Sequence, residues 1–388
     1  MGPLINRNVE IALDIGATPR FTVRRMASIP DSGFLLIADL TGYTAYVARG
    51  EIEHAPAIAG DLLETIVGRL EPPFRLAKLE GDAAFLHVEN GRAEPSLLLD
   101  AIDACYAAFR RRLRSIEQAT SCDCTACATA PRLDLKFFVH HGLYVRGKIA
   151  GRDELAGSDV IIVHRLLKGR GRAAVNAAPE GFYGFALFTA EAVVALGVEP
   201  AALGMVPGSE SIEHLGDVTT YTLGLDARWR AESAARRLTL RDGAAVVDLE
   251  QPVRASAAVV WAYLTSPALR PSWEGPIAID ESLPAGTRGV GTESRCVTGR
   301  LATLEEIVDW QPYEHVGYRL AVPGVGPVEA TYDLRDDGDS TVVRWRWAPS
   351  ETAAVEPGAI TTTRRERSAA LGRLAKRLRS DRRLEVQT

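Results

Sequence analysis

An apolar run that ends on an acid constrains this chain more than any other stretch. Residues 33–38 are apolar apart from the leading glycine, Asp39 follows, and Gly42 opens a turn shortly afterwards. A strand that is buried on both faces reads as a continuous hydrophobic run, and a charge near its carboxyl end lies where the backbone leaves the core. We therefore expect a central strand that delivers Asp39 to a site.

A second acidic turn follows in Lys78-Leu79-Glu80-Gly81-Asp82. The segments 74–79 and 83–88 on either side predict a hairpin whose tip presents Asp82. Two carboxylates on neighbouring strands suit Mg²⁺ or Mn²⁺, which proteins bind through one or two carboxylates together with substrate phosphates. The alternative explanation is that Asp and Gly occur at both places because they favour turns.

These two turns resemble those of the class III nucleotide cyclase domain of adenylate and guanylate cyclases. That family places its first metal-binding aspartate in an Asp-x-x-Gly-Phe-Thr turn and its second in a Gly-Asp turn. The resemblance extends from Gly33 to Asp226, and a cysteine-containing insertion makes it closest to an uncharacterised bacterial branch of that fold. It implies a ferredoxin-like cyclase-type domain, metal binding by Asp39 and Asp82, and a homodimer, because such sites form between two copies.

The resemblance also assigns roles along the segment 154–168. Lys78 and Glu154 occupy the positions that read the nucleotide base. Asp153 is a competing candidate for the role of Glu154. The alternative explanation of Lys78 is an ordinary solvent-facing strand residue. Arg165 matches the transition-state arginine, whose planar guanidinium can stabilise charge on the α-phosphate.

Ile161 departs from the family pattern, which has a ribose-orienting asparagine at this position. Isoleucine cannot form a hydrogen bond, and the loss of a positioning group costs on the order of 10²-fold in rate. His164 and Lys168 are the candidate side chains to compensate, although a helical histidine is more often a satisfied structural residue. The sequence predicts a domain that binds divalent metal and a nucleoside triphosphate with weak or no cyclisation; the alternative is an active cyclase that makes a 3′,5′-cyclic nucleotide.

Three of the cysteines crowd into one loop. Cys122, Cys124 and Cys127 form a C-x-C-x-x-C cluster between a predicted helix and a predicted strand. Three thiolates at this spacing suit Zn²⁺, with a fourth ligand from His140, His141 or a partner chain. A loop with incidental thiols and a C-x-x-C redox pair are the alternatives. The odd total of five cysteines argues against a structural disulfide framework.

The pattern of the chain changes after residue 237. A strand, a helix that begins after Ser256, a series of strands and a long C-terminal helix follow, together with the segment 261–267 and Trp273, which we expect in an exposed turn. This order resembles the START-like superfamily, the helix-grip fold that includes polyketide cyclases and lipid-transfer proteins. The resemblance implies an apolar cavity for a small hydrophobic ligand beneath the last helix, or alternatively an aromatase/cyclase or lipid-carrier activity.

The tryptophans of this half have two explanations. They pack in a core, as large aromatic residues usually do, or they line the ligand pocket; they are Trp261, Trp273, Trp310, Trp345 and Trp347. The basic residues of the last helix predict its solvent-facing side, with an anionic membrane surface as the minor alternative.

Length and charge complete the predicted organisation. A chain of 388 residues predicts two domains, and we expect an α+β protein with a loose leader over 1–32, the cyclase-like domain over 33–226, a linker over 227–237 and the START-like domain over 238–380. The net charge of −5 predicts no nucleic-acid partner. No apolar run approaches the ~20 residues of a membrane span, and no signal peptide is evident, so we expect a cytoplasmic protein.

Overall fold

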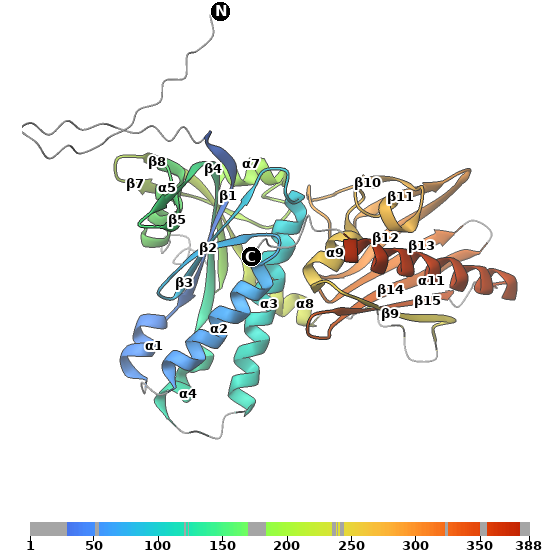
Figure 1. Ribbon diagram of the computed structural model, residues 1–388, viewed down its shortest axis with the longest axis horizontal. Helices are drawn as coiled ribbons and strands as arrows, with labels where there is room; N and C mark the ends of the chain where they lie inside the picture. Colours follow the sequence, from blue (N-terminus) through green and yellow to red (C-terminus); the bar gives the residue numbers. More distant parts are fainter. Residues whose placement is uncertain are drawn as a thin grey trace, which may run out of the picture.

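Two β-sheets, each with its own helices, lie side by side in the computed structural model (Figure 1). The structure describes residues 29–50, 54–119, 122, 124–169, 184–234, 238, 240, 244–322, 325–349 and 355–380. The predicted α+β fold class is confirmed. Most of the predicted leader lies outside the described residues, but Asp31 and Ser32 already belong to the first strand.

The sheet of the first domain has the strand order β2-β3-β1-β4-β6-β8-β7, with β5 paired to β4. The β4–β6 pair is parallel and the other pairs are antiparallel. Its strands are β1 (Asp31–Thr41), β2 (Arg75–Glu80), β3 (Ala83–Glu89), β4 (Asp134–Ile149), β5 (Arg152–Ala156), β6 (Phe185–Thr189), β7 (Val206–Ile212) and β8 (Gly216–Gly224). The central position of β1, between β3 and β4, is the one its apolar run predicts.

Helices cover both faces of this sheet. They are α1 (Tyr43–Arg49), α2 (Ala55–Leu70), α3 (Pro95–Ala119), α4 (Thr125–Thr129), α5 (Ser158–Lys168), α7 (Ala190–Leu196) and α8 (Leu225–Ala234). Because strand side chains alternate between faces, Leu36 and Ala38 of β1 pack with α2 and α3, whereas Leu35 and Ile37 pack with α5. Two cores therefore share the one strand.

Strand β4 differs from its prediction. The apolar pattern of residues 133–149 predicts a strand over 133–142 with 143–149 as its hairpin partner, but residues 143–149 extend the same strand, which pairs with β1 as far as Tyr144 and then with β5. Gly142 lies within this strand, where its lack of a side chain allows a close approach. A Cβ at this position would lie 2.3 Å from Oδ2 of Asp159, at the start of α5.

Most of the segment expected to be a linker is the helix α8. It packs against α3: Arg228 forms an ion pair with Asp103 at 3.0 Å, and the guanidinium groups of Arg110 and Arg114 lie over the ring of Trp229. The charged, Ala-rich composition of this segment did not predict these contacts, because the residues that α8 contacts lie on α3, far away in the sequence.

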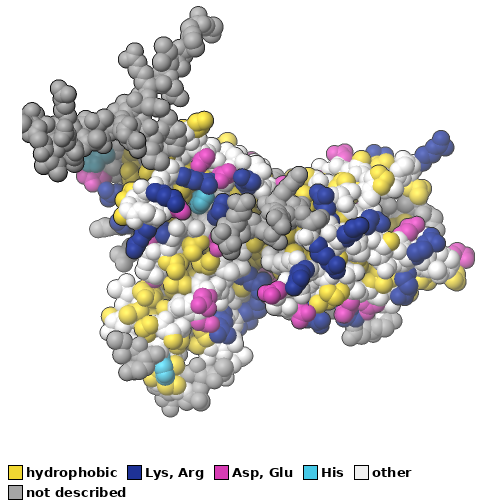
Figure 2. All heavy atoms as spheres, in the orientation of Figure 1, with side chains coloured by type: hydrophobic (Ala, Val, Ile, Leu, Met, Phe, Trp, Pro, Cys, Tyr) yellow, Lys and Arg dark blue, Asp and Glu magenta, His cyan; other side chains and the backbone are white. Residues whose placement is uncertain are grey.

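The second sheet is antiparallel, with the order β10-β11-β12-β13-β14-β15-β9, and the long helix α11 lies across it (Figure 1). The elements are β9 (Val247–Val253), α9 (Ala257–Thr265), α10 (Pro271–Glu274), β10 (Ala278–Ser282), β11 (Glu293–Thr298), β12 (Leu301–Gln311), β13 (His315–Val322), β14 (Gly326–Asp336), β15 (Thr341–Pro349) and α11 (Pro357–Ser380). The predicted apolar face of α11 is buried, and Figure 2 shows Lys and Arg side chains along its exposed side. Among the described residues, no helix combines the length and apolar character needed to cross a membrane.

Trp273 is fully buried, so the prediction of an exposed turn is wrong. The indole nitrogen of Trp273 donates to the carbonyl oxygen of Tyr263 at 2.8 Å, and Arg373 of α11 donates to the carbonyl oxygen of Trp273. The last helix, whose Arg373 lies 100 positions later, covers a turn that looks exposed in isolation. All five tryptophans of this domain are buried, which favours the core explanation.

A buried carboxylate joins the two domains. Asp100 of α3 accepts hydrogen bonds from the indole nitrogens of Trp261 and Trp310, both at 3.0 Å. Burial raises the pKa of Asp100 to about 7, against the two indole donors that lower it. Glu94 of the first domain adds a 2.7 Å ion pair with Arg288 of the second.

Asp100 makes the stability of the folded chain depend on pH. Between about pH 4 and 7 the folded state holds a proton on Asp100 that the unfolded state has released, so the contribution of this group to stability falls as the pH rises. The free energy of unfolding of the wild type, relative to that of Asp100→Asn, should fall by up to about 1.4 kcal/mol per pH unit across this window. Denaturant titrations at several pH values measure it.

The exposed Asp61 supplies the control, because it pairs with Arg112 at the surface. Asp61→Asn should change the free energy of unfolding by less than about 1 kcal/mol. A difference between wild type and Asp100→Asn that is constant from pH 4 to 7 would contradict the assignment of a raised pKa to Asp100.

Candidate functional site

Strand β1 places Asp39 on the α5 side of the first sheet. Asp39 follows Leu35 and Ile37 on this face, is partly buried, and lies opposite Ala83 of β3 and Lys136 of β4. Asp82 directly precedes Ala83, and its carbonyl oxygen accepts a hydrogen bond from the amide of Leu40 at 3.3 Å. The two acidic turns identified in the sequence therefore meet at one end of neighbouring strands.

The two carboxylates repel each other. Burial, and next the charge of Asp82, raise the pKa of Asp39 to about 6, while the ammonium of Lys136 lowers it. Burial also raises the pKa of Asp82. A divalent cation between the two groups would relieve this repulsion, and carboxylate oxygens are the ligands that Mg²⁺ and Mn²⁺ prefer. The donor set fits the predicted metal.

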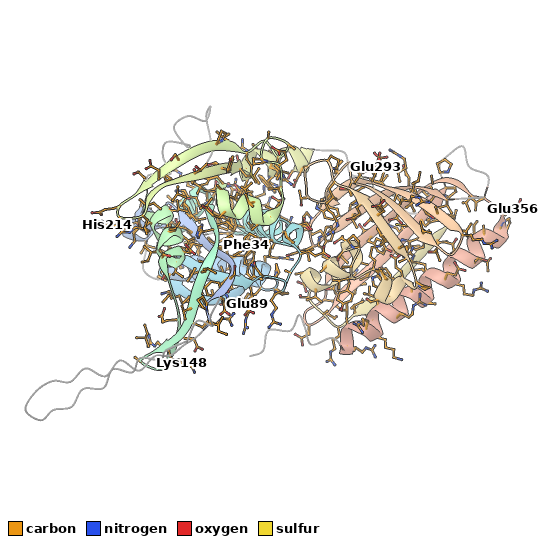
Figure 3. All side chains as sticks on the ribbon, turned by 90° about the horizontal axis from the view of Figure 1, so that it is seen from above. Phe34, Glu89, Lys148, His214, Glu293 and Glu356 are labelled. Carbon is orange, nitrogen blue, oxygen red and sulfur yellow. The ribbon has the colours of Figure 1, made fainter. Side chains whose placement is uncertain are left out.

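Lys78 and Glu154 also come together. Nζ of Lys78 on β2 lies 3.1 Å from Oε2 of Glu154 on β5, and equally close to Oε1 of Glu80. Burial opposes the charge of Lys78, but these two carboxylates raise its pKa overall. Asp153, the competing acid, is exposed and faces Lys148 at 3.6 Å. Figure 3 shows Lys148 pointing away from the second domain, near the end of the first.

The sequence analysis did not assign a role to Glu80. It bridges Lys78 and the ring of His164 on α5, whose Nε2 lies 3.1 Å from Oε2 of Glu80. Burial opposes ionisation of Glu80, but Lys78 and His164 lower its pKa overall. The period of a strand could have revealed it, because Lys78 and Glu80 are two positions apart and share a face. His164 also contacts the carbonyl oxygen of Val160 at 2.7 Å, so both its ring nitrogens have partners.

Arg165 is not brought to the carboxylates within one chain. It is exposed on α5, and across the described residues its side chain makes no hydrogen bond or ion pair. Ile161 lies one turn earlier on the same face of α5, with 52% of its surface exposed. Lys168 is exposed as well. The two positions predicted to serve catalysis, Arg165 and Ile161, therefore face solvent and not the carboxylates of the same chain.

The cysteine loop has a different neighbour from those predicted. Neither His140 nor His141 reaches the cysteines: Nδ1 of His140 lies 2.9 Å from the hydroxyl of Thr189, and Nε2 of His141 lies 2.9 Å from Oδ1 of Asn90. His54, immediately before α2, lies beside the sulfur atoms instead. Sequence spacing gave no signal for His54, because two helices and a hairpin, α2 to α3, separate it from the cysteines.

The second domain has a charged interior beneath α11. Arg270 forms ion pairs with Glu305 at 2.8 Å and with Glu274 at 3.1 Å, and Arg367 of α11 donates to the hydroxyl of Tyr332 at 2.7 Å. The resemblance implied an apolar cavity in this place. The basic residues of α11 were expected on its solvent-facing side, but Arg367 points inward; Arg270 lies in the turn before α10.

A pocket of about 910 Å³ lies at the junction of the two domains. The first domain contributes Phe34 of β1 and Leu98 of α3, and the second contributes Val259 and Tyr263 of α9. Arg377 adds a charged group at its wall. A cavity of this size and lining suits a small, largely apolar ligand.

Two family models match different parts of the chain. Residues 59–173 match the model described as "Protein of unknown function (DUF2652)", and residues 244–379 match "Polyketide cyclase / dehydrase and lipid transport". The second match confirms the predicted type of C-terminal domain. The chain is also 33% identical over 164 residues to "Uncharacterized protein Rv2561/Rv2562" of Mycobacterium tuberculosis, an alignment that covers 42% of this chain and 72% of that protein.

Similar solved structures include two adenylyl cyclases and DynU16. A bacterial light-regulated adenylyl cyclase is 12% identical with a TM-score of 0.38, covering 50% of this chain and 52% of that one. The adenylyl cyclase CyaB from P. aeruginosa is 13% identical with a TM-score of 0.37, covering 51% and 95%. DynU16, from the dynemicin biosynthetic locus, is 20% identical with a TM-score of 0.30, covering 34% and 47%. This chain spans about half the length of the first and third.

Replacing Asp39 should separate stability from metal binding. Asp39→Asn removes a buried charge, so the metal-free protein at pH 7.5 should be as stable as the wild type or more stable by about 1 kcal/mol, a value reduced for partial exposure. The rise in Tm on adding Mn²⁺ should disappear, because one carboxylate ligand is lost. Thermal unfolding with and without Mn²⁺ measures both effects.

The exposed Asp153 is the matched control, and Asp153→Asn should keep the rise in Tm with Mn²⁺. An equal rise in Asp39→Asn and wild type would show that the cation binds elsewhere.

Proposed function

Since the chain belongs to the family of the Mycobacterium tuberculosis protein Rv2561/Rv2562, we propose a function from its own site: the first domain binds a divalent cation and a nucleoside triphosphate with weak or no cyclisation. The second domain couples this binding to a small apolar ligand, so that the whole chain is a sensor or binding protein. The alternative is an active nucleotide cyclase that releases a 3′,5′-cyclic nucleotide.

The convergence of Asp39 and Asp82 carries this proposal. Two strands from different parts of the sequence bring these carboxylates to one end of the sheet, where the charge of Asp82 adds to the cost of ionising Asp39. Mg²⁺ or Mn²⁺ would be held by Asp39 and Asp82. When bound, it supplies positive charge against a triphosphate, which is the main requirement of phosphoryl chemistry.

The pair formed by Lys78 and Glu154 supports a nucleotide as the second ligand. Together they offer a donor and an acceptor at 3.1 Å separation, the combination that a purine edge needs. Glu80 holds Lys78 from its other side and keeps its ammonium in place when Glu154 turns to a base.

A homodimer would complete the site. Arg165 faces outward from α5, and Ile161, one turn earlier on the same face of this helix, is 52% exposed. A second copy would bring Arg165 to the carboxylates of the first.

Ile161 is the reason for proposing binding without efficient turnover. An isoleucine at the ribose-orienting position leaves the attacking hydroxyl without a fixed hydrogen bond, and orientation of this kind is worth orders of magnitude in rate. Its neighbours do not replace it, since both ring nitrogens of His164 are already engaged.

One assay separates binding from catalysis. Purified protein is incubated with Mn²⁺ and each of the four ribonucleoside triphosphates, with calorimetry for binding and chromatography for product, and with Asp39→Ala as the control. We expect binding of a nucleotide that Asp39→Ala loses, with little cyclic product. Abundant cyclic product that vanishes in Asp39→Ala would overturn the binding-only function in favour of the cyclase.

Restoring the missing amide should restore turnover. Ile161→Asn should raise the rate of cyclic nucleotide formation by about 10-fold or more, because it supplies the absent hydrogen bond. Ile161→Leu is the matched control and should leave the rate unchanged. If Ile161→Asn binds the triphosphate normally yet gains no activity, the loss of turnover has a different cause.

The junction pocket favours ligand binding as a second candidate function. It brings Phe34, on the strand that carries Asp39, against Val259 and Tyr263 of the second domain. A ligand there would contact the sheet of the first domain directly. Aromatase/cyclase or lipid-carrier activity of the second domain is the competing role for the same ligand.

Native mass spectrometry of the purified chain tests this candidate. We expect a co-purified lipophilic molecule that is lost in Ala258→Trp, which fills the pocket wall, and retained in Ala201→Trp at an exposed position. A chemically altered molecule released over time would instead support catalysis by the second domain.

A further inference from the structure

A second group of metal-ligating side chains lies at the end of the first domain near α1 and α4, away from the second domain (Figure 1). It consists of His54, Cys122, Cys124 and Cys127, whose ligand atoms all lie within 4.8 Å of one another. Nδ1 of His54 is 3.2 Å from Sγ of Cys124, 3.7 Å from that of Cys122 and 3.6 Å from that of Cys127. One ring nitrogen therefore faces three sulfur atoms.

Two of these distances, 3.6 and 3.7 Å, match the edges of a zinc tetrahedron, and the third, 3.2 Å, is shorter. With Zn–S bonds of about 2.3 Å and Zn–N bonds of about 2.0–2.1 Å, neighbouring ligand atoms lie about 3.5–3.8 Å apart. A disulfide would bring two sulfur atoms to about 2.05 Å, and none of the three cysteines forms a disulfide. The four ligand atoms are close enough together to bind a single ion.

The surroundings hold two of these ligands in position. The backbone amide of Cys127 donates to Sγ of Cys124 at 3.4 Å, and the amide of Ala128 donates to the carbonyl oxygen of Cys124 at 3.0 Å. Hydrogen bonds of this kind to a ligand orient it for metal binding. Cys127 is buried, so the set is closed on one side.

The ligands come from two segments that pack tightly. His54 precedes α2, and the cysteines lie in the connection between α3 and β4. Gly50 lies between α1 and His54, and a Cβ at this position would approach the Cβ atoms of Ala55 and Ala126 to 3.0 and 3.2 Å. No side chain fits between the two segments at this point.

We propose that His54, Cys122, Cys124 and Cys127 bind one structural Zn²⁺ ion that joins the α1–α2 connection to the α3–β4 connection. Four protein ligands leave no open position, so the ion stabilises the fold and takes no substrate. Thiolate and imidazole ligands select zinc, whereas the oxygen ligands Asp39 and Asp82 select Mg²⁺ or Mn²⁺. The zinc site therefore does not depend on the proposed nucleotide function. Because α1 directly follows β1, the ion anchors the segment that leaves the Asp39 strand.

Metal content and cobalt substitution of the full chain test the proposal. Protein purified with zinc in the growth medium should contain about one zinc per chain by elemental mass spectrometry. Replacement by Co²⁺ should produce thiolate-to-metal charge-transfer absorption and the intense visible bands of a tetrahedral site. Removal of zinc with a strong chelator should lower Tm by several degrees.

Variants identify the ligands. Cys124→Ser and His54→Gln should each lower zinc affinity by at least about 10-fold, while Cys296→Ser, a buried thiol of the second domain, and Asp39→Ala should retain one zinc per chain. If the ligand variants fail to fold, the cobalt spectrum of the wild type decides. Less than about 0.2 zinc per chain without charge-transfer absorption, a disulfide within the cluster, or bound iron in place of zinc would overturn the proposal.

Discussion

The first domain depends on one constraint: β1 has no free edge and no free face. β3 and β4 hydrogen-bond to both its edges, and its alternate side chains enter two cores, one under α2 and α3 and the other under α5. Every position from Phe34 to Ala38 must therefore be apolar. Asp39 is the first charge after this apolar run, and it lies on the α5 face where that core ends. The candidate metal site is polar because β1 is no longer covered by apolar side chains at this end.

The junction of the two domains depends on a buried polar group, Asp100, and its two indole partners. Asp100 lies within α3, whose apolar residues belong to the core of the first sheet, yet both its oxygen atoms face the second domain. Trp261 and Trp310 need acceptors for their indole nitrogens when buried, and Asp100 supplies both. The same helix lines the junction pocket through Leu98. A ligand in that pocket would thus contact the helix on which the two domains meet.

Some residues of the candidate site could be predicted from the sequence pattern and others could not. Lys78 and Asp82 belong to one turn, and Glu154 follows from resemblance, so their shared location could be predicted. Glu80 could have been found from strand alternation. His54 could not, because a loop ligand is recognised only when the chain path brings it back to the cysteines. The charged interior around Arg270 was equally hidden, since its partner Glu305 lies on a strand 35 positions later.

The sequence by itself determined the two-domain α+β organisation, the central strand and the two acidic turns. These features follow from local causes: the period of apolar residues, the turn chemistry of Gly and Asp, and the length over which a pattern persists. Only the tertiary structure decided that residues 143–149 continue β4, that Trp273 is buried, and that His54 joins the cysteines. Each of these outcomes depends on a contact between segments far apart in the chain, and local propensity contains no information about such contacts.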